Sequence, residues 1–319
     1  MNSQIELDSI IELINNARKI GIFTHKSPDG DAIGSSLSLY LGLKQLKKDV
    51  DIITDEYSQC FSFLPSINET KRSSNEKYDL AIALDCASRG RLYDPKNCFE
   101  KSVKCISIDH HSSNTYFANY NYVEGTSPAV CKTLIKILKR LNISLTVDIG
   151  TCLMAGIITD SGGFRYSGVD DETFEFAAHM LDLGVNISDV YYRTFDVKTK
   201  AQFKLQSIAT ARLKFYSSDR IALTYLTLKE LKSANAMIGD HEGIVDIGRN
   251  IEGVEVSIFF REDIDGTYKV SLRSNDYVNV SDVAEVFNGG GHDRAAGCEI
   301  NDTLDNTIKK LVKEVSKRL

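Results

Sequence analysis

Residues 24–31 read Thr24-His25-Lys26-Ser27-Pro28-Asp29-Gly30-Asp31, and the rest of the chain is organised around them. An apolar run at 20–23 predicts a short buried strand before this stretch, and apolar residues at helical spacing over 32–46 predict a helix after it. Pro28 and Gly30 are turn residues, which lets the backbone bring one imidazole and two carboxylates toward one point. Asp31 is also a candidate N-cap of the following helix. Taken alone, the stretch fits either a cluster of ligands or an Asp-rich turn with a helix cap.

The composition is that of a globular protein with an acidic balance. A length of 319 residues predicts two domains, and a hydrophobic content of 42% supplies sizeable cores. The formal net charge of −6 argues against sequence-independent binding of long nucleic acid, which needs a basic surface. A small phosphate-bearing substrate, held by metal ions and a few arginines, is compatible with this charge.

Cysteine usage and hydropathy bear on the location of the protein. The seven cysteines show no Cys-x-x-Cys spacing, which predicts free thiols and neither a disulfide framework nor a zinc ribbon. The polar, acidic start at 1–7 does not resemble a secretory signal, and no apolar run reaches the ~18 residues that span a bilayer. We therefore expect a cytoplasmic protein that does not enter a membrane.

Strands alternate with helices in the first part of the chain. Further strands are predicted at 50–53, 78–84 and 103–108, and helices at 5–17, 128–141, 147–158, 171–183 and 187–195. The segment 61–75 has turn-like composition and is expected to be irregular. This alternation predicts an α/β domain over 1–190, with a parallel sheet and helices on both of its faces.

The pattern changes near Asp196. A helix predicted at 199–213 lies in a helical linker over 191–213. Beyond it the sequence predicts strands at 220–226, 254–260, 268–273 and 298–300, and helices at 282–287 and 304–318. We expect 214–319 to form a smaller mixed α/β domain.

Acidic and imidazole side chains follow three predicted strands, and one more acidic residue ends a predicted helix. With the first stretch, the set is His25, Asp29, Asp31, Asp85, Asp109, His110, His111 and Asp160. Ligands of an open parallel sheet bind outside the carboxyl ends of its strands, so we expect these residues on one rim. Each Asp could merely cap a helix or turn. Together, however, so many carboxylates would repel one another unless cations neutralised them. Carboxylate with imidazole suits Mn²⁺ or a similar divalent ion, and the ligands suffice for two.

The sequence lacks the EF-hand, P-loop and dinucleotide-binding motifs. The twelfth position counted from Asp29 is Tyr40 instead of Glu, which excludes an EF-hand loop. Neither G-x-x-x-x-G-K-[ST] nor G-x-G-x-x-G occurs, so neither P-loop nor dinucleotide chemistry is supported.

A second candidate site is the glycine-rich segment Gly289-Gly290-Gly291-His292. Three glycines let the backbone approach an anion and offer its N–H groups. His292 and Arg273 could add charged donors to a phosphate, although a glycine-rich turn with a surface histidine is the alternative. His179 and His241 have no such neighbours in sequence, and we expect both to be structural or exposed.

The order of these motifs resembles that of the DHH phosphoesterase superfamily. His25-x-x-x-Asp29-x-Asp31, Asp85, Asp109-His110-His111 and Asp160 look like its four motifs. The segment Gly289-Gly290-Gly291-His292-x-x-Ala295-Ala296-Gly297 is similar to the companion DHHA1 domain. The resemblance runs from about residue 20 to residue 300. The two-domain layout resembles the NrnA-type branch, which degrades nanoRNA and dephosphorylates 3′-phosphoadenosine-5′-phosphate (pAp).

The resemblance implies two divalent metal ions, most often Mn²⁺, with Mg²⁺ or Co²⁺ as alternatives. One ion would be held by His25, Asp29 and Asp85, and the other by Asp31, Asp85, His110 and Asp160. Asp85 would bridge the two ions, Asp109 would orient a ligand histidine, and His111 would face the substrate phosphate. Asn114, Arg165 and the turn at 161–163 also follow family motifs. Residues 127–129 read Ser-Pro-Ala, where the family often has small-small-Glu.

The DHHA1 resemblance implies a substrate site in the second domain. Its residues would be Arg273, Ser274, Gly289, Gly290, Gly291 and His292. Two anchors on two domains predict a substrate of fixed short length. The resemblance implies oligoribonucleotides of about two to five nucleotides, including pApA and pGpG, cleaved to mononucleotides, with pAp converted to AMP. Rival functions are an inorganic pyrophosphatase, a RecJ-like single-strand exonuclease, and a metal- or nucleotide-binding module without turnover. The oligomeric state is open, and a homodimer is compatible with the sequence.

Overall fold

The computed structural model describes residues 7–166, 168–263 and 266–319. The chain divides into two compact units, Met1–Val197 and Lys198–Leu319. This boundary falls inside the predicted linker 191–213. The π-helical turn Tyr192–Asp196 belongs to the first unit, and α8 (Lys200–Ala211) belongs to the second.

A parallel six-stranded sheet forms the centre of the first unit, in the order β3-β2-β1-β4-β5-β6. Its strands are β1 (Lys19–Phe23), β2 (Asp49–Ile53), β3 (Thr70–Lys71), β4 (Leu80–Leu84), β5 (Lys104–Asp109) and β6 (Tyr120–Val123). The predicted α/β class and parallel sheet are confirmed. β3, in the segment expected to be irregular, and β6 were not predicted, because such short edge strands carry little apolar pattern.

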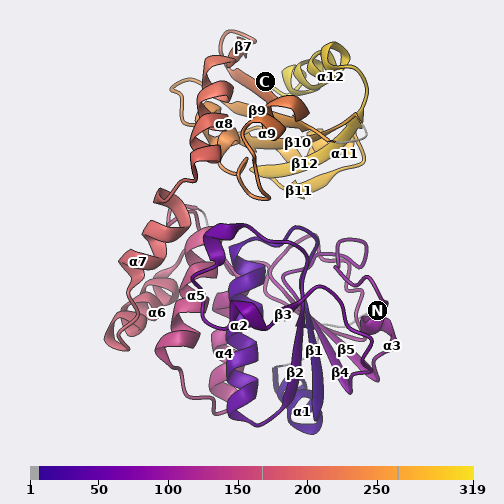
Figure 1. Cartoon of the computed structure of the whole chain (residues 1–319), viewed down its shortest axis with the longest axis vertical. Helices are drawn as coiled ribbons and strands as arrows, with labels where there is room; N and C mark the ends of the chain where they lie inside the picture. The colour runs from indigo at the N-terminus through magenta and orange to yellow at the C-terminus, as the bar shows by residue number, and fades with distance from the viewer. Residues whose placement is uncertain (1–6, 167, 264–265) are drawn as a thin grey trace. The chain divides into compact units, whose positions relative to one another are not determined.

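Helices cover the two faces of this sheet unequally (Figure 1). On one face lie α1 (Leu7–Asn16), α2 (Gly30–Gln45), α4 (Val130–Arg140) and α5 (Val147–Asp160). The other face carries the short α3 (Cys98–Lys101) and loop segments, where the ring of Phe23 meets those of Tyr78 and Phe99 edge-on. Next to α5 pack α6 (Asp171–Asp182) and α7 (Ile187–Tyr191).

Helices α2 and α5 cross closely because each has glycine at the crossing. A Cβ on Gly34 of α2 would overlap the carbonyl oxygen of Cys152, and a Cβ on Gly156 of α5 would overlap Sγ of Cys131. The close crossing brings the first turn of α2 beside the last turns of α5. The acidic residues at these two helix ends can therefore approach one another.

The second unit is built on a mixed sheet in the order β11-β12-β10-β9-β8-β7, in which β8 and β9 run parallel and the other neighbours antiparallel. Its strands are β7 (Lys214–Tyr216), β8 (Ile221–Leu226), β9 (Val256–Glu262), β10 (Thr267–Ser274), β11 (Gly290–His292) and β12 (Ala295–Asn301). Its other helices are α9 (Leu228–Ser233), α10 (Ile244–Arg249), α11 (Val280–Glu285) and α12 (Leu304–Ser316). The smaller mixed α/β domain is confirmed, although β7, β11, α9 and α10 were not predicted.

The two faces of the second sheet are covered differently (Figure 1). Helices α11 and α12 pack on the face that carries Val270 and Leu272, while α8 and α10 pack on the opposite face around Phe259. Along β10, side chains alternate between buried and half-exposed. The half-exposed side of β10 is the face on which Arg273 lies.

Two further expectations concern the whole chain. None of the seven cysteines, all within the described ranges, forms a disulfide, as predicted. Among the helices of the described residues, none has the length and apolar character needed to cross a membrane.

Candidate metal centre

The candidate ligands lie at the topological switch point of the first sheet. From β1 the sheet extends through β2 and β3 on one side and through β4, β5 and β6 on the other. His25 follows β1 and Asp85 follows β4, so the two residues flank the point at which open parallel sheets bind their ligands. Asp109 ends the next strand, β5, and is followed directly by His110 and His111.

Asp29 and Asp31 reach the centre from the start of α2. Asp29 is the N-cap of α2, and its Oδ1 accepts the backbone N–H groups of Asp31 and Ala32 at 3.1 Å each. The expectation that Asp31 caps α2 is wrong. Its carboxylate instead accepts the N–H groups of Val130 and Cys131, at 2.5 and 2.9 Å, in the first turn of α4. The positive end of a second helix thereby holds Asp31 at the centre.

Asp160 is the last residue of α5 and approaches from the opposite helix. One turn earlier, Gly156 packs against Asp31, where a Cβ would lie 2.7 Å from Oδ1 of that carboxylate. Oδ2 of Asp160 lies 3.1 Å from Nε2 of His110. Glycine at position 156 therefore lets carboxylates from two helices converge near one imidazole.

His25 and His110 turn their Nε2 atoms toward the carboxylates because the backbone engages their Nδ1 atoms. Nδ1 of His25 lies 2.9 Å from the carbonyl oxygen of Lys26, and Nδ1 of His110 lies 2.9 Å from that of Ser127. A carbonyl oxygen only accepts hydrogen bonds, so each Nδ1 carries a proton. Nε2 of His25 is 3.6 Å from Asp85, and Nε2 of His110 is 3.5 Å from the other oxygen of Asp85. Both Nε2 atoms thus face a carboxylate across a space suited to a shared cation.

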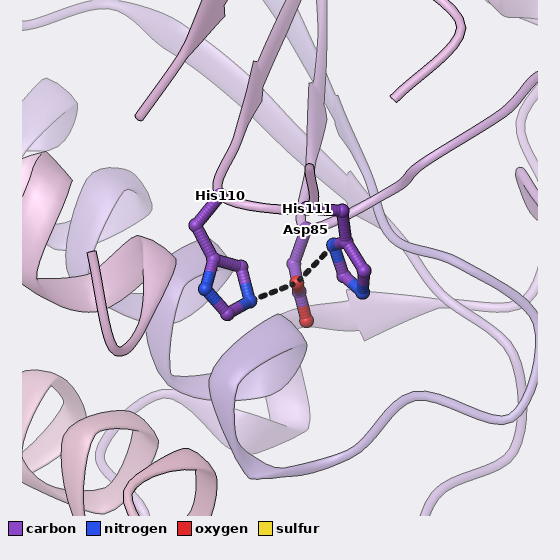
Figure 2. A group of neighbouring side chains, drawn as sticks. All are labelled: Asp85, His110 and His111. Carbon is purple, nitrogen blue, oxygen red and sulfur yellow. Dashed lines mark ion pairs between the residues drawn. The ribbon is translucent and has the colours of Figure 1, made fainter. Parts of the chain in front are cut away.

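Asp85 lies between the imidazoles. Figure 2 shows the rings of His110 and His111 on opposite sides of its carboxylate, with Oδ1 at 3.5 and 3.6 Å from their nearest nitrogens. Among the described residues, no hydrogen-bond donor reaches this buried oxygen. The backbone of Asp85 is also left-handed, with φ of 55°, a conformation that costs a non-glycine residue about 1 kcal/mol or more. A buried carboxylate oxygen without a donor, on a residue whose backbone is left-handed, fits coordination of a cation.

Asp109 positions His111, not the ligand candidate His110. Oδ1 of Asp109 lies 2.7 Å from Nδ1 of His111, and its Oδ2 accepts a hydrogen bond of 2.6 Å from Asn114. The expectation that Asp109 orients a ligand histidine therefore applies in the structure to His111. The backbone carbonyl of Ser127, which orients His110, could not be found from sequence, because it carries no side-chain signal.

Burial and mutual charge shift the pKa values of the cluster. Burial opposes ionisation of Asp85, but the imidazoles of His110 and His25 outweigh it and hold the pKa of Asp85 well below its usual range. Against the effect of burial, the facing carboxylates raise the pKa values of His25 and His110 well above the ordinary value. Burial raises the pKa of Asp160 to about 6. Protons and divalent cations therefore compete for the same atoms in this cluster.

The described side chains form three groups that could hold a metal ion, with ligand atoms within 4.8 Å of one another. The groups are His25, Asp29 and Asp85; Asp31, His110 and Asp160; and Asp85, His110 and His111. Asp85 is shared by two of them. All six predicted metal ligands therefore meet at one place, and His111, predicted to face substrate, also lies within reach of a cation.

The predicted substrate residues of the second unit divide between the two faces of its sheet. Strand register pairs Arg273 with Ala295 and Ala295 with His292, so these three side chains share a face. Ser274 is fully buried on the opposite face, where its Oγ donates to the carbonyl oxygen of Asp293. The side chain of Ser274 therefore does not join Arg273.

The glycine-rich segment is a short edge strand, β11. A Cβ at Gly289 would collide with the carbonyl oxygen of Gly297, and one at Gly291 would collide with that of Ala295. A Cβ at Gly290 would meet no atom within 4 Å, because open space lies above it. Glycine at 289 and 291 allows close pairing of β11 with β12. At position 290 there is open space on the face of the sheet that also carries His292 and Arg273.

Comparison with known proteins decides the family. The model of the DHH family N-terminal domain matches residues 19–157, and that of the DHHA1 domain matches residues 222–319. A bifunctional oligoribonuclease and PAP phosphatase NrnA of Thermus thermophilus is 31% identical over 94% of this chain and 90% of its own length. The chain belongs to the DHH family. The resemblance inferred from the motifs is confirmed.

Other relatives of this DHH protein extend the comparison. A bifunctional oligoribonuclease and PAP phosphatase NrnA of Mycoplasma genitalium is 26% identical over 95% of this chain and 98% of its own. The crystal structure of an exopolyphosphatase-related protein from Bacteroides fragilis matches with a TM-score of 0.88 and 27% identity, over 98% of this chain and 95% of that one. This DHH protein is accordingly a hydrolase of phosphate esters.

Proposed function

We propose that this DHH hydrolase cleaves oligoribonucleotides of about two to five nucleotides, including pApA- and pGpG-like dinucleotides, to mononucleotides, and converts pAp to AMP. Two curated relatives that match nearly the whole chain carry both activities in their names. The observation that carries the proposal is the buried Oδ1 of Asp85, which faces His110 and His111 without a hydrogen-bond donor among the described residues.

Two divalent cations complete the proposed site. His25, Asp29 and Asp85 would hold one ion, and Asp31, Asp85, His110 and Asp160 would hold the other. The mixture of carboxylate and imidazole favours Mn²⁺ over the harder Mg²⁺. When bound, the ions supply Lewis-acid stabilisation of the charge that develops on the phosphoryl oxygens.

His111 is the proposed proton donor. Burial works against its charged form, but the hydrogen bond to Asp109 and the charge of Asp85 raise the pKa of His111 above its ordinary value. This shift favours the protonated ring. Because Nδ1 is directed at Asp109, the second ring nitrogen, Nε2, is the one that can donate to a phosphate oxygen or a leaving group.

Arg273 and His292 are the proposed phosphate-binding side chains of the second unit. The two side chains share a face of the sheet, where Arg273 is half-exposed and His292 is exposed. A guanidinium with an imidazole is a donor set suited to a phosphate group.

The test uses purified protein with Mn²⁺ and six substrates, assayed separately: pAp, pApA, a five-nucleotide RNA, a twenty-four-nucleotide RNA, pyrophosphate and polyphosphate. We expect AMP from pAp, mononucleotides from the two short RNAs, and little cleavage of the long RNA. Cleavage of pyrophosphate or polyphosphate alone would refute the proposed substrates while leaving the metal centre intact. Equal cleavage of long and short RNA would indicate a RecJ-like exonuclease.

The matched variants are Asp85→Asn and Asp182→Asn. Asparagine tolerates the left-handed backbone at position 85, so Asp85→Asn removes the charge while preserving the fold. We expect it to lower kcat by about 10²-fold or more, because the shared ligand is lost. Asp182 is exposed at the end of α6 and should leave kcat unchanged. A fully active Asp85→Asn enzyme would refute the two-metal proposal.

A further inference from the structure

The half-exposed face of β10, β12 and β11 carries a row of small residues beside Arg273, as the strand register shows. Ser271 pairs with Gly297, and Gly297 pairs with Gly290, so the three residues form one row across the strands. We call this row the glycine face. With two residues lacking a side chain and open space above Gly290, the glycine face exposes flat backbone to a ligand.

Cationic side chains flank the glycine face on two sides. The neighbouring row on one side contains Arg273 and His292. The row on the other side contains Arg261 and Lys269, which register with each other across β9 and β10. Asp263 lies 2.9 Å from Lys269 and 3.9 Å from Arg261, and Glu299 registers with Lys269, so this second flank also carries negative charge.

A pair of stacked aromatic rings, those of Phe259 and His241, lies next to Ser271 of the glycine face. Phe259 pairs with Ser271 and therefore lies in the same row, on the side of the row opposite β11. The imidazole of His241 stacks on Phe259, with ring centroids 6.4 Å apart and an interplanar angle of 28°. His241, expected to be structural or exposed, is half-buried against Phe259, a contact that no motif in the sequence predicts.

The imidazole of His241 is neutral near physiological pH. Burial, together with the charges of Arg261 and Lys269, lowers the pKa of His241 to about 4 against the opposing effect of Asp240. A neutral imidazole has one donor and one acceptor nitrogen. Within the described ranges, neither ring nitrogen of His241 has a hydrogen-bond partner. The edge of a nucleobase offers the complementary mixture of donors and acceptors.

We infer that His241 contacts the nucleobase of the substrate. In this arrangement the base lies over the glycine face, its edge meets the ring nitrogens of His241, and its phosphate lies at Arg273 and His292. A floor without side chains leaves room for a flat ring. Proteins hold unpaired bases by stacking and by hydrogen bonds to the base edges. This inference deepens the proposed function and rests on it.

The test compares pAp with an abasic ribose 3,5-bisphosphate in the intact, metal-loaded enzyme. His241→Ala should raise KM for pAp about five- to tenfold, the loss of roughly one net hydrogen bond, with kcat unchanged. KM for the abasic substrate should not change. His241→Asn, which keeps a donor and an acceptor, should recover most of the affinity for pAp. His179→Ala, at an exposed position of α6, is the matched control and should behave as wild type.

Two outcomes would overturn the inference. One is an unchanged KM for pAp in His241→Ala, and the other is an equal increase for both substrates. Failure of the proposed function would look different, because the wild-type enzyme would then cleave neither pAp nor short RNA. In that case the affinities of the wild type and of His241→Ala for AMP and for ribose 5-phosphate, measured by calorimetry, still test whether His241 contacts the base. Loss of the preference for AMP in His241→Ala supports the base contact, and an unchanged preference refutes it.

Discussion

The carboxylate of Asp31 caps α4, a helix that begins 99 residues further along the chain at Val130. Its two oxygens accept the N–H groups of Val130 and Cys131 in a fully buried environment. The same carboxylate belongs to a candidate metal group with His110 and Asp160. The packing of α4 and the binding of a cation therefore depend on one side chain.

Asp31→Ala should weaken both folding and metal binding. Removal of the acceptor leaves two buried N–H groups unsatisfied, which should lower the free energy of unfolding by about 1–3 kcal/mol. The increase in Tm on addition of Mn²⁺ should also be reduced. Urea unfolding and thermal melts with and without Mn²⁺ measure the two effects, with Asp182→Ala as an exposed control. Wild-type stability in Asp31→Ala would contradict the capping role.

Asp109→Asn should lower activity without removing metal. Asparagine cannot hold the protonated ring of His111 as the carboxylate does, so we expect kcat to fall about 10–100-fold, as for other residues that orient an active-site histidine. Metal content per chain, measured by elemental analysis, should stay at the wild-type value. Asn114→Ala removes the hydrogen bond to Oδ2 of Asp109 and should give a smaller loss. A parallel fall in metal content would contradict a role of Asp109 confined to His111.

The ion pair of Lys132 with Asp170 predicts acid sensitivity. Nζ of the buried Lys132 lies 2.6 and 2.5 Å from the two oxygens of Asp170, which lowers the pKa of Asp170 from 3.8 to about 2. Because the folded pKa is the lower one, ionised Asp170 stabilises the fold above about pH 4. This contribution is lost as the pH falls from about 4 through about 2.

Lys132→Met should remove that contribution. The difference in unfolding midpoint between wild type and Lys132→Met should be largest above pH 4 and shrink toward pH 2, as measured by urea unfolding over this range. Lys139→Met, at an exposed position of the same helix, is the control. A difference independent of pH would show that Lys132 acts through packing and not through its charge.

Glu255 should be a stability determinant of the second unit. Its buried carboxylate accepts the backbone N–H groups of Asp276, Tyr277 and Val278, at distances from 2.8 to 3.2 Å. Glu255→Gln replaces one acceptor by an amide donor and should destabilise the protein by about 1–3 kcal/mol. Chemical unfolding measures the change, and Glu252→Gln at an exposed neighbouring position should show none.

Strands that are buried on both sides were predictable from local pattern. The apolar runs at 20–23, 78–84 and 103–108 correspond to β1, β4 and β5, because central parallel strands are nearly continuous in apolar residues. The short edge strands β3, β7 and β11 and the six-residue α9 and α10 carry too few residues for a period to be recognised.

The sequence by itself determined which side chains gather at the centre. His25, Asp85 and Asp109 each follow or end an apolar strand, and strands of a parallel sheet all end at the same rim. Only the tertiary structure decided their partners. Asp31 caps α4 instead of α2, Asp109 holds His111, and Ser274 faces away from Arg273. The physical reason is that these pairings depend on burial, on helix crossing and on strand register between distant segments, which local spacing does not encode.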